Sequence, residues 1–225
     1  MTNLLLGALF FISIHLFISG TGLRRILVNV MGGTAFKAVF ALLSLSGIVW
    51  MSMAYGSAPQ IELWGELPAI KPIAALAMAF AFLFIVTGVS TPSPTAIGGE
   101  MLLSQDEPAK GILRITRHPV MWGTSIWGLV HLTANGDLAS LVFFGSLLFL
   151  ALIGPFFIDR KRMKLSKRRW DTFRKKTSSF PFLAIVEKRN RLDLKEIGLG
   201  RLAGGLVVFA LFLYFHSMLF GVPAI

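Results

Sequence analysis

The four histidines are the side chains of this sequence best suited to chemistry. His15, His131 and His216 lie inside apolar stretches, and His118 lies at the start of another. An ionisable group in a bilayer is costly unless it faces the interior of a helix bundle with a partner, so these histidines are candidate functional residues. Neutral imidazole binds haem iron, zinc or copper and relays protons, whereas a hydrogen bond between helices is the alternative role for each of them.

Depth in the membrane indicates which histidines could share one haem. At ~1.5 Å per helical residue, His15 lies about 12 Å from the cytoplasmic end of its span, His118 near that end, and His131 about 20 Å from it. Because a haem tolerates an offset of several Å between its axial ligands, His15 could pair with either His118 or His131, and spacing alone does not choose between them. His216 lies near the outer end of its span and is not expected to bind a metal.

A second candidate site surrounds His118, which follows Arg114 and Arg117 and precedes Pro119. Proline suits the first turn of a helix, where its missing N–H costs no hydrogen bond. Two arginines beside a helix N-terminus form an anion-binding corner that would accept a haem propionate or the carboxylate of a nucleotide-like cofactor. Simple anchoring at the cytoplasmic surface is the alternative role of these bases. No residue is assigned as catalytic.

Six apolar spans must position these residues, and they predict an all-α polytopic membrane bundle with one domain over residues 1–225. Hydrophobic residues make up 55% of the chain and charged residues 15%, and the mean hydropathy is +0.72. In a soluble domain, roughly a quarter of the residues are charged. A helix that crosses a bilayer instead needs about 20 consecutive apolar residues. The predicted spans are residues 3–22, 35–55, 69–90, 119–134, 138–158 and 200–220.

Nearly all the positive charge lies on one side of this arrangement. The net charge is +11. The loops after the first, third and fifth spans, together with the span ends next to them, hold 21 of the 22 Lys and Arg residues, against Lys71 alone on the other side. The positive-inside rule therefore places both termini in the periplasm and the basic loop, residues 159–199, in the cytoplasm. Fifteen of the bases lie between residues 159 and 201, a distribution that explains the charge without nucleic-acid binding.

The basic loop carries apolar side chains among its bases. Met163, Trp170 and Phe173 are spaced to share one helical face within residues 159–176, which predicts an amphipathic helix on the cytoplasmic membrane surface. Its expected partners are the lipid bilayer itself and an anionic lipid or a membrane protein. The chain has no cysteine, so disulfides, thiol catalysis and iron–sulfur ligation are excluded.

The motifs resemble the NnrU family of bacterial inner-membrane proteins, which is associated with nitrite and nitric oxide reduction and is similar to the plant 15-cis-zeta-carotene isomerases. The resemblance covers most of the chain in order. It is carried by His15 with Ser19-Gly20-Thr21 and Leu23-Arg24-Arg25, by Pro92-Ser93-Pro94-Thr95, by residues 111–123, by His131 and Asn135-Gly136-Asp137, by Asp159-Arg160-Lys161, by Trp170-Asp171 and by residues 177–182.

This resemblance implies a haem b site, because the plant isomerases bind haem b through two histidines. It implies His15 and His118 as the axial ligands, with His131 as the second choice. The residues expected to bind the cofactor are Arg24, Arg114, Arg117 and His118. The plant enzymes carry a cysteine three residues before the second histidine. Ile115 stands there in this chain, so cysteine-dependent ligation is not available.

The Arg-His-Pro segment is also similar to membrane methyltransferases that act on isoprenylcysteine or phospholipids. These enzymes hold S-adenosylmethionine with a following tyrosine and a later pair of glutamates. Here Met121 replaces the tyrosine, and Asp159-Arg160 stands where the acid pair is expected. The favoured function is therefore a haem-dependent isomerase or redox protein of the inner membrane. A non-enzymatic accessory protein is the first alternative and a methyltransferase the second.

Overall fold

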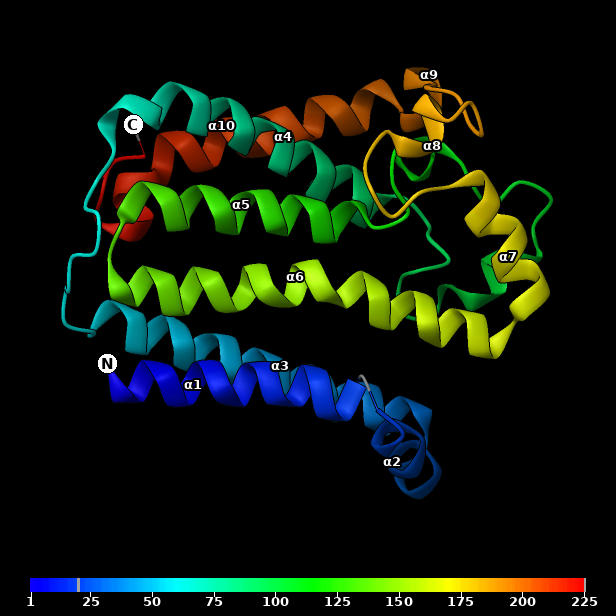
Figure 1. Cartoon of the computed structure of the whole chain (residues 1–225), viewed down its shortest axis with the longest axis horizontal. Coiled ribbons are helices and arrows are strands. Elements are labelled where there is room, and N and C mark those ends of the chain that lie inside the picture. The colour runs from blue at the N-terminus through cyan, green and yellow to red at the C-terminus, as the bar shows by residue number, and fades with distance from the viewer. Residues whose placement is uncertain (20, 225) are drawn as a thin grey trace. The chain divides into compact units, whose positions relative to one another are not determined.

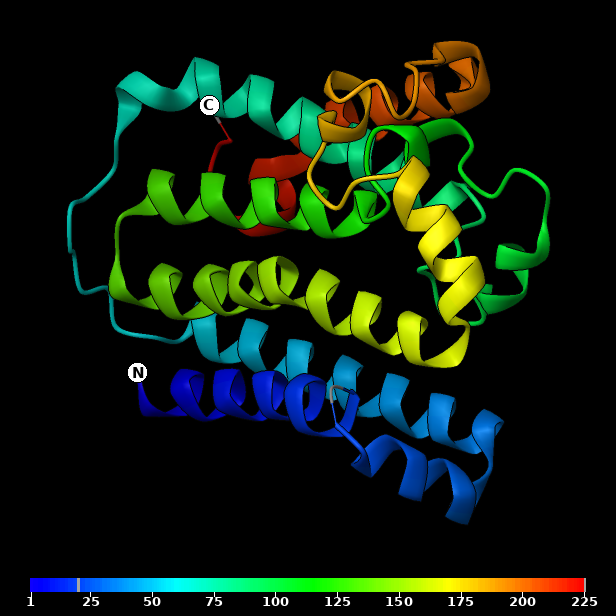
Figure 2. The same cartoon turned by 45° about the vertical axis from the view of Figure 1, so that its right-hand side comes forward.

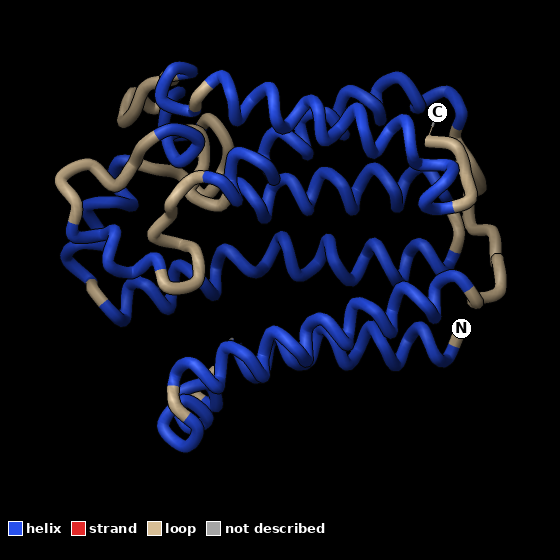
Figure 3. The backbone as a smooth tube through the Cα atoms, turned by 180° about the vertical axis from the view of Figure 1, so that it is seen from behind, coloured by secondary structure: helices blue, strands red, loops and turns tan. Residues whose placement is uncertain are grey.

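The computed structural model describes residues 1–19 and 21–224, and over these residues the chain is helical without a β-strand (Figure 3). A bilayer favours this class because each backbone group must find its hydrogen bond inside the spanning segment. The predicted all-α class is therefore confirmed. Gly20, which belongs to one of the motifs above, lies outside the described residues.

The helices agree closely with the predicted spans, and a π-helical turn over Ile14–Ser19 follows the first of them. Short 3₁₀ turns cover Pro68–Ile70, Gly99–Ser104 and Gly111–Arg114. The α-helices are α1 (Thr2–Ser13), α2 (Leu23–Met31), α3 (Gly33–Gly56), α4 (Lys71–Ser90), α5 (Pro119–Asn135), α6 (Leu138–Leu165), α7 (Lys167–Lys176), α8 (Leu183–Val186), α9 (Leu194–Ile197) and α10 (Leu199–Phe220).

Four of the described helical segments are long and apolar enough to cross a membrane: Gly33–Gly56, Pro68–Ser90, Leu138–Leu165 and Leu199–Phe220. A fifth results if the bent pair Thr2–Ile18 and Leu23–Met31 is one span. The remaining predicted span forms α5, whose 17 residues measure about 26 Å at ~1.5 Å each, less than a ~30 Å bilayer core. Four or five spans are thus supported, and the count of six and the orientation of the termini stay predictions.

The amphipathic helix expected over residues 159–176 is two separate helices. α6 continues past the predicted end of its span to Leu165, and α7 begins at Lys167 after a break at Ser166. Met163 therefore belongs to α6, so the prediction of one shared face with Trp170 and Phe173 is wrong. The two α7 aromatics are 1% and 0% exposed, and they pack with Leu103 and Ala109 rather than facing lipid.

The chain divides into two compact units. Unit 1 comprises Met1–Pro68 and His131–Leu150, and unit 2 comprises Ala69–Val130 and Ala151–Ile225. In unit 1, α1 and α3 lie side by side (Figures 1 and 2). Gly7 faces Met51 and Gly47 faces Phe11. Small residues at these contacts let the two helices approach closely.

A polar cluster joins two segments of unit 1 that are distant in sequence. The Gly136 carbonyl accepts the backbone N–H groups of Leu63 and Trp64, at 2.9 and 3.0 Å. The Ser140 hydroxyl lies 2.9 Å from the Tyr55 hydroxyl and donates to the Asp137 carboxylate at 2.5 Å. These bonds account for the Asn-Gly-Asp motif as a structural connection between α3 and the start of α6.

Close helix packing also organises unit 2. α4 and α10 run alongside each other (Figure 1), and the ring of Phe82 contacts those of Phe209 and Phe212 at 5.9 and 5.3 Å between centroids. α4 also meets α5, where a Cβ added at Gly123 would lie 2.6 Å from the Ile85 side chain and 2.7 Å from the Ala81 carbonyl oxygen. The glycine in the sequence motif Trp122-Gly123 is thus explained by this helix contact.

We expect Gly123→Ala to destabilise the protein by about 1–3 kcal/mol, because the added methyl group must push α5 away from the α4 backbone. Thermal unfolding in detergent measures the effect. Gly200→Ala is the matched control, since a Cβ there meets nothing within 4 Å. Equal melting temperatures of the two variants would contradict the close contact.

Candidate functional site

An Arg–Asp–His cluster lies where α5 begins. The Asp159 carboxylate, on α6, accepts hydrogen bonds from the Arg117 Nε at 3.0 Å and the Arg117 Nη2 at 2.5 Å. Its other oxygen lies 2.8 Å from the His118 Nε2. The three side chains are 20%, 9% and 1% exposed for Asp159, Arg117 and His118 respectively, so the cluster is largely removed from water.

The protonation of His118 follows from its partner. Since an ionised carboxylate only accepts hydrogen bonds, the Nε2 atom carries the ring proton and donates it to Asp159. Burial lowers the pKa of His118, and the bond to Asp159 opposes this only in part. The imidazole is therefore neutral near pH 7, with the Nδ1 lone pair available. A carboxylate on one ring nitrogen orients the ring and raises the basicity of the other nitrogen.

Two loops that are distant in sequence hold the backbone of this site. The first follows α7, where the Ser178 carbonyl accepts the Arg117 N–H at 2.9 Å. The Ser179 carbonyl accepts the Thr116 hydroxyl and the Trp122 indole N–H, both at 2.7 Å. These bonds explain why the motif over residues 177–182 accompanies the Arg-His-Pro motif.

The second loop follows α4 and carries the Pro-Ser-Pro-Thr motif. The Thr95 hydroxyl donates to the Arg117 carbonyl at 2.8 Å and lies 2.8 Å from the Ser93 hydroxyl. The same loop is attached to α6, because the buried Arg162 Nη2 donates to the Ala96 carbonyl at 2.5 Å. Three sequence motifs therefore meet at the two residues Arg117 and His118.

Arg114 is held away from the cluster by a second carboxylate. Its Nε and Nη2 donate to the two oxygens of Glu196 at 2.7 and 2.8 Å, and its Nη1 donates to Asn190 at 2.7 Å. The hydrogen bond from Arg114 is the main cause that lowers the pKa of Glu196 to about 2. Both arginines of the predicted anion-binding corner are thus engaged by carboxylates of the chain, and a cofactor anion would have to displace one of them.

His15, in unit 1, lies in the π-helical turn after α1. Its Nδ1 donates to the Phe11 carbonyl at 2.8 Å, which leaves the Nε2 lone pair as the available ligand atom. The His15 ring lies 5.3 Å from Phe40, the Phe40 ring 6.0 Å from Phe36, and the Arg24 guanidinium 5.3 Å from Phe36. The structure thus brings His15 and Arg24 into one aromatic row, and π-helical turns recur at functional sites.

The two remaining histidines have local partners. His131, also in unit 1, stacks on Phe144 with ring centroids 4.8 Å apart. The His216 Nδ1 lies 2.7 Å from the Val222 carbonyl in unit 2. Within the part of the chain that the structure describes, no three His, Asp or Glu side chains converge on a bare metal ion. Two imidazoles on a haem do not require such a group.

Sequence reasoning did not identify Asp159 as the partner of His118, nor Glu196 as the partner of Arg114. In the sequence, Asp159 is part of one motif of the family resemblance and stands where a methyltransferase would carry an acid pair, and neither observation indicates His118 as its partner. One signal could have found it, because Asp159 is the first charged residue after a long apolar span and would be costly there without a cation.

Comparison with known proteins identifies relatives along nearly the whole chain. A family model described as NnrU protein matches residues 3–224. The 15-cis-zeta-carotene isomerase of Arabidopsis thaliana is 29% identical over 180 residues, 76% of this chain and 47% of that protein. The Zea mays enzyme of the same name is 35% identical over 82 residues, 36% of this chain and 22% of that protein. The chain therefore spans at most about half the length of these relatives. No solved structure matches it significantly.

We expect Asp159→Asn to destabilise the protein by about 3 kcal/mol, because it leaves the buried Arg117 guanidinium without its countercharge. Asp171→Asn is the control, since that carboxylate is 36% exposed and lies 4.0 Å from Arg174. It should change stability by no more than about 0.5 kcal/mol. Thermal melts of both variants in one detergent compare them, and similar losses would show that the Asp159 cluster is not a major contributor.

Glu196→Gln should show a stability loss that depends on pH. The folded pKa of Glu196, about 2, lies below its ordinary value of 4.5, so its ionised form stabilises the fold above pH 4.5, and this contribution disappears as the pH falls through about 2. The gap in melting temperature between the wild type and the variant should therefore close over this range. A gap that stays constant would contradict the assignment, and Glu187→Gln, at an exposed ion pair, provides the control.

Proposed function

The chain belongs to the NnrU family, and from this membership we propose that it is an integral membrane protein with an isomerase-like or redox activity that depends on haem b. The similarity to two 15-cis-zeta-carotene isomerases supports the isomerase class. The observation that carries the haem assignment is the hydrogen bonding of His15 and His118, since each ring gives one nitrogen to a protein acceptor and keeps the other for a metal.

The donor set of these two histidines fits the group. A metal-bound histidine usually donates its second ring N–H to a carbonyl or a carboxylate, as His15 does to Phe11 and His118 to Asp159. The Nδ1 atom of His118 adjoins Cβ and is more crowded than an Nε2 atom. Ligation through the His118 Nε2 would instead require Asp159 to release it. When bound, haem would supply an iron centre that can change its oxidation state or bind a substrate atom.

The residues around His118 keep it ready to bind a metal or to accept a proton. Asp159 fixes the ring tautomer, and Arg117 keeps Asp159 in its charged form through hydrogen bonds from its Nε and Nη2 atoms. If the His118 Nδ1 accepts a proton, the neighbouring carboxylate stabilises the resulting imidazolium. Arg24, in the aromatic row with His15, is the arginine best placed to bind a propionate without displacing a carboxylate of the chain.

We also propose how the chain lies in the membrane and in which membrane it resides. α5 serves as the sixth span, both termini face the periplasm, and residues 159–199 face the cytoplasm of a bacterial inner membrane. This orientation is supported by the distribution of Lys and Arg, of which 21 lie on the cytoplasmic side and one on the other. A role in nitrite and nitric oxide metabolism follows from the family association alone. The methyltransferase alternative loses support because Asp159 already binds Arg117 and His118.

The absorption spectrum of the detergent-purified protein tests the haem proposal. We expect a Soret band that shifts on dithionite reduction, with sharp α and β bands from two nitrogen ligands. His15→Ala and His118→Ala should each change or abolish this spectrum, whereas His216→Ala should retain it. His131→Ala tests the second-choice ligand.

A protein from haem-replete cells that shows no Soret band, even after addition of hemin, would contradict the haem proposal and leave the accessory role as the better explanation. Loss of the band in His131→Ala, but not in His118→Ala, would identify His131 as the second ligand in place of His118.

A further inference from the structure

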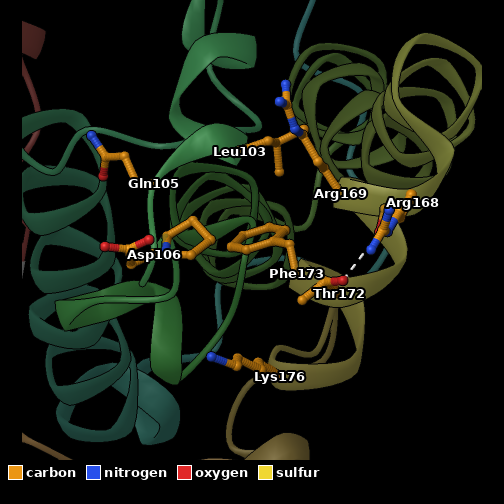
Figure 4. A pocket seen from close by; sticks show the side chains of 9 residues that line it. Leu103, Gln105, Asp106, Arg168, Arg169, Thr172, Phe173 and Lys176 are labelled. Atoms are coloured by element: carbon orange, nitrogen blue, oxygen red, sulfur yellow. Dashed lines mark hydrogen bonds between the residues drawn. The ribbon is translucent and has the colours of Figure 1, made fainter.

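A small cavity lies beside α7, apart from the residues assigned to haem. Its volume is about 230 Å³. One wall comes from α7 and the other from the loop after the 3₁₀ turn Gly99–Ser104, as Figure 4 shows. The residues that line it include Leu103, Asp106, Arg168, Arg169, Phe173 and Lys176.

The lining is basic on the α7 side. Arg168 and Arg169 form no ion pair with a carboxylate of the described residues, whereas Lys176 lies 3.1 Å from Glu107. Asp106 is the one acid among the lining residues, and Figure 4 shows it across the cavity from the two arginines. The α7 side of the cavity therefore has two guanidinium groups without a carboxylate partner among the described residues, and the opposite loop has one carboxylate.

The walls of the cavity are held in place by buried contacts. Phe173 and Leu103 belong to one core cluster with Trp170 and Ala109, and Phe173 is fully buried. The cluster fixes the α7 wall against the loop that carries Asp106. A site whose walls are already in place loses little conformational freedom when it binds a ligand.

The size and position of the cavity restrict its ligand. Pockets for drug-sized ligands measure about 300–1,000 Å³, so this cavity suits a single headgroup rather than haem.

The position of Arg168 places the cavity near the membrane surface. Arg168 follows α6, and α6 extends seven residues beyond Ile158, the predicted end of its span, which is about 10 Å at ~1.5 Å per residue. The polar region of a bilayer leaflet is about 5–8 Å deep, and an arginine side chain can reach back toward it.

We propose that this cavity binds a phosphate group, supplied by the headgroup of a membrane phospholipid. Arg168 and Arg169 bind the phosphate oxygens, because guanidinium matches phosphate with paired hydrogen bonds. Asp106 accepts a hydrogen bond from a hydroxyl or ammonium group on the same headgroup. The site shares no residue with the proposed haem ligands, and its test requires no haem.

The test compares melting temperatures of the full chain in detergent with and without three additives. These are short-chain phosphatidylglycerol, diacylglycerol with the same acyl chains, and inorganic phosphate. The double variant Arg168→Gln with Arg169→Gln is matched by Arg174→Gln with Lys175→Gln, which removes the same charge from α7 outside the cavity. Both arginines of the cavity are exposed, and the melting temperature without additive checks that the fold is kept.

We expect phosphatidylglycerol to raise the melting temperature of the wild type and of the Arg174/Lys175 variant, with diacylglycerol ineffective. The Arg168/Arg169 variant should need at least about tenfold more lipid for the same shift in melting temperature, since two charge-assisted contacts are lost. An equal shift with inorganic phosphate would support the phosphate site and overturn its lipid source. No response of the wild type, or equal responses of the two double variants, would overturn the site.

Discussion

The carboxylate of Asp159 lies near the end of an apolar helix, where an isolated negative charge would be costly. Arg117 supplies the countercharge and His118 supplies a second hydrogen bond, so the acid, the base and the imidazole are stable there only as a group. This requirement holds the start of α5 against α6. Burial keeps the His118 imidazole neutral, although the bond to Asp159 opposes this in part. The bond occupies only one ring nitrogen, so the other is free, as both metal binding and proton acceptance require.

The positions of the surrounding loops follow from the same cluster. Arg117 and His118 can remain in place only if their backbone is held, and the loops around Thr95 and Ser178 bind it from two sides. Arg114, three residues earlier, anchors α9 through Glu196. The basic segments therefore do more than orient the chain in the membrane. Several of the arginines counted in the positive-inside pattern are interior partners of carboxylates.

The hydrophobic pattern was sufficient to predict the helices, because α3, α4, α5 and α10 begin and end within two residues of the expected spans. It could not predict where α6 ends, since helical hydrogen bonding continues past Ile158, the end of the continuous apolar run, to Leu165. Nor could it show that Trp170 packs on Leu103, more than sixty residues away, instead of on lipid. The motifs identified His118, but spacing along the chain contains no information on its contact with Asp159.

The pairing of Arg117 with Asp159 joins residues that are 42 positions apart, which affects the order of events during synthesis. At ~5–20 residues per second, about 2–8 s separate the synthesis of the two residues. During this interval the guanidinium and imidazole at the start of α5 lack the Asp159 carboxylate that binds them in the folded protein. The Ser178 and Ser179 carbonyls follow later still. The site therefore assembles late, and a nascent chain that stops before α6 is complete cannot contain it.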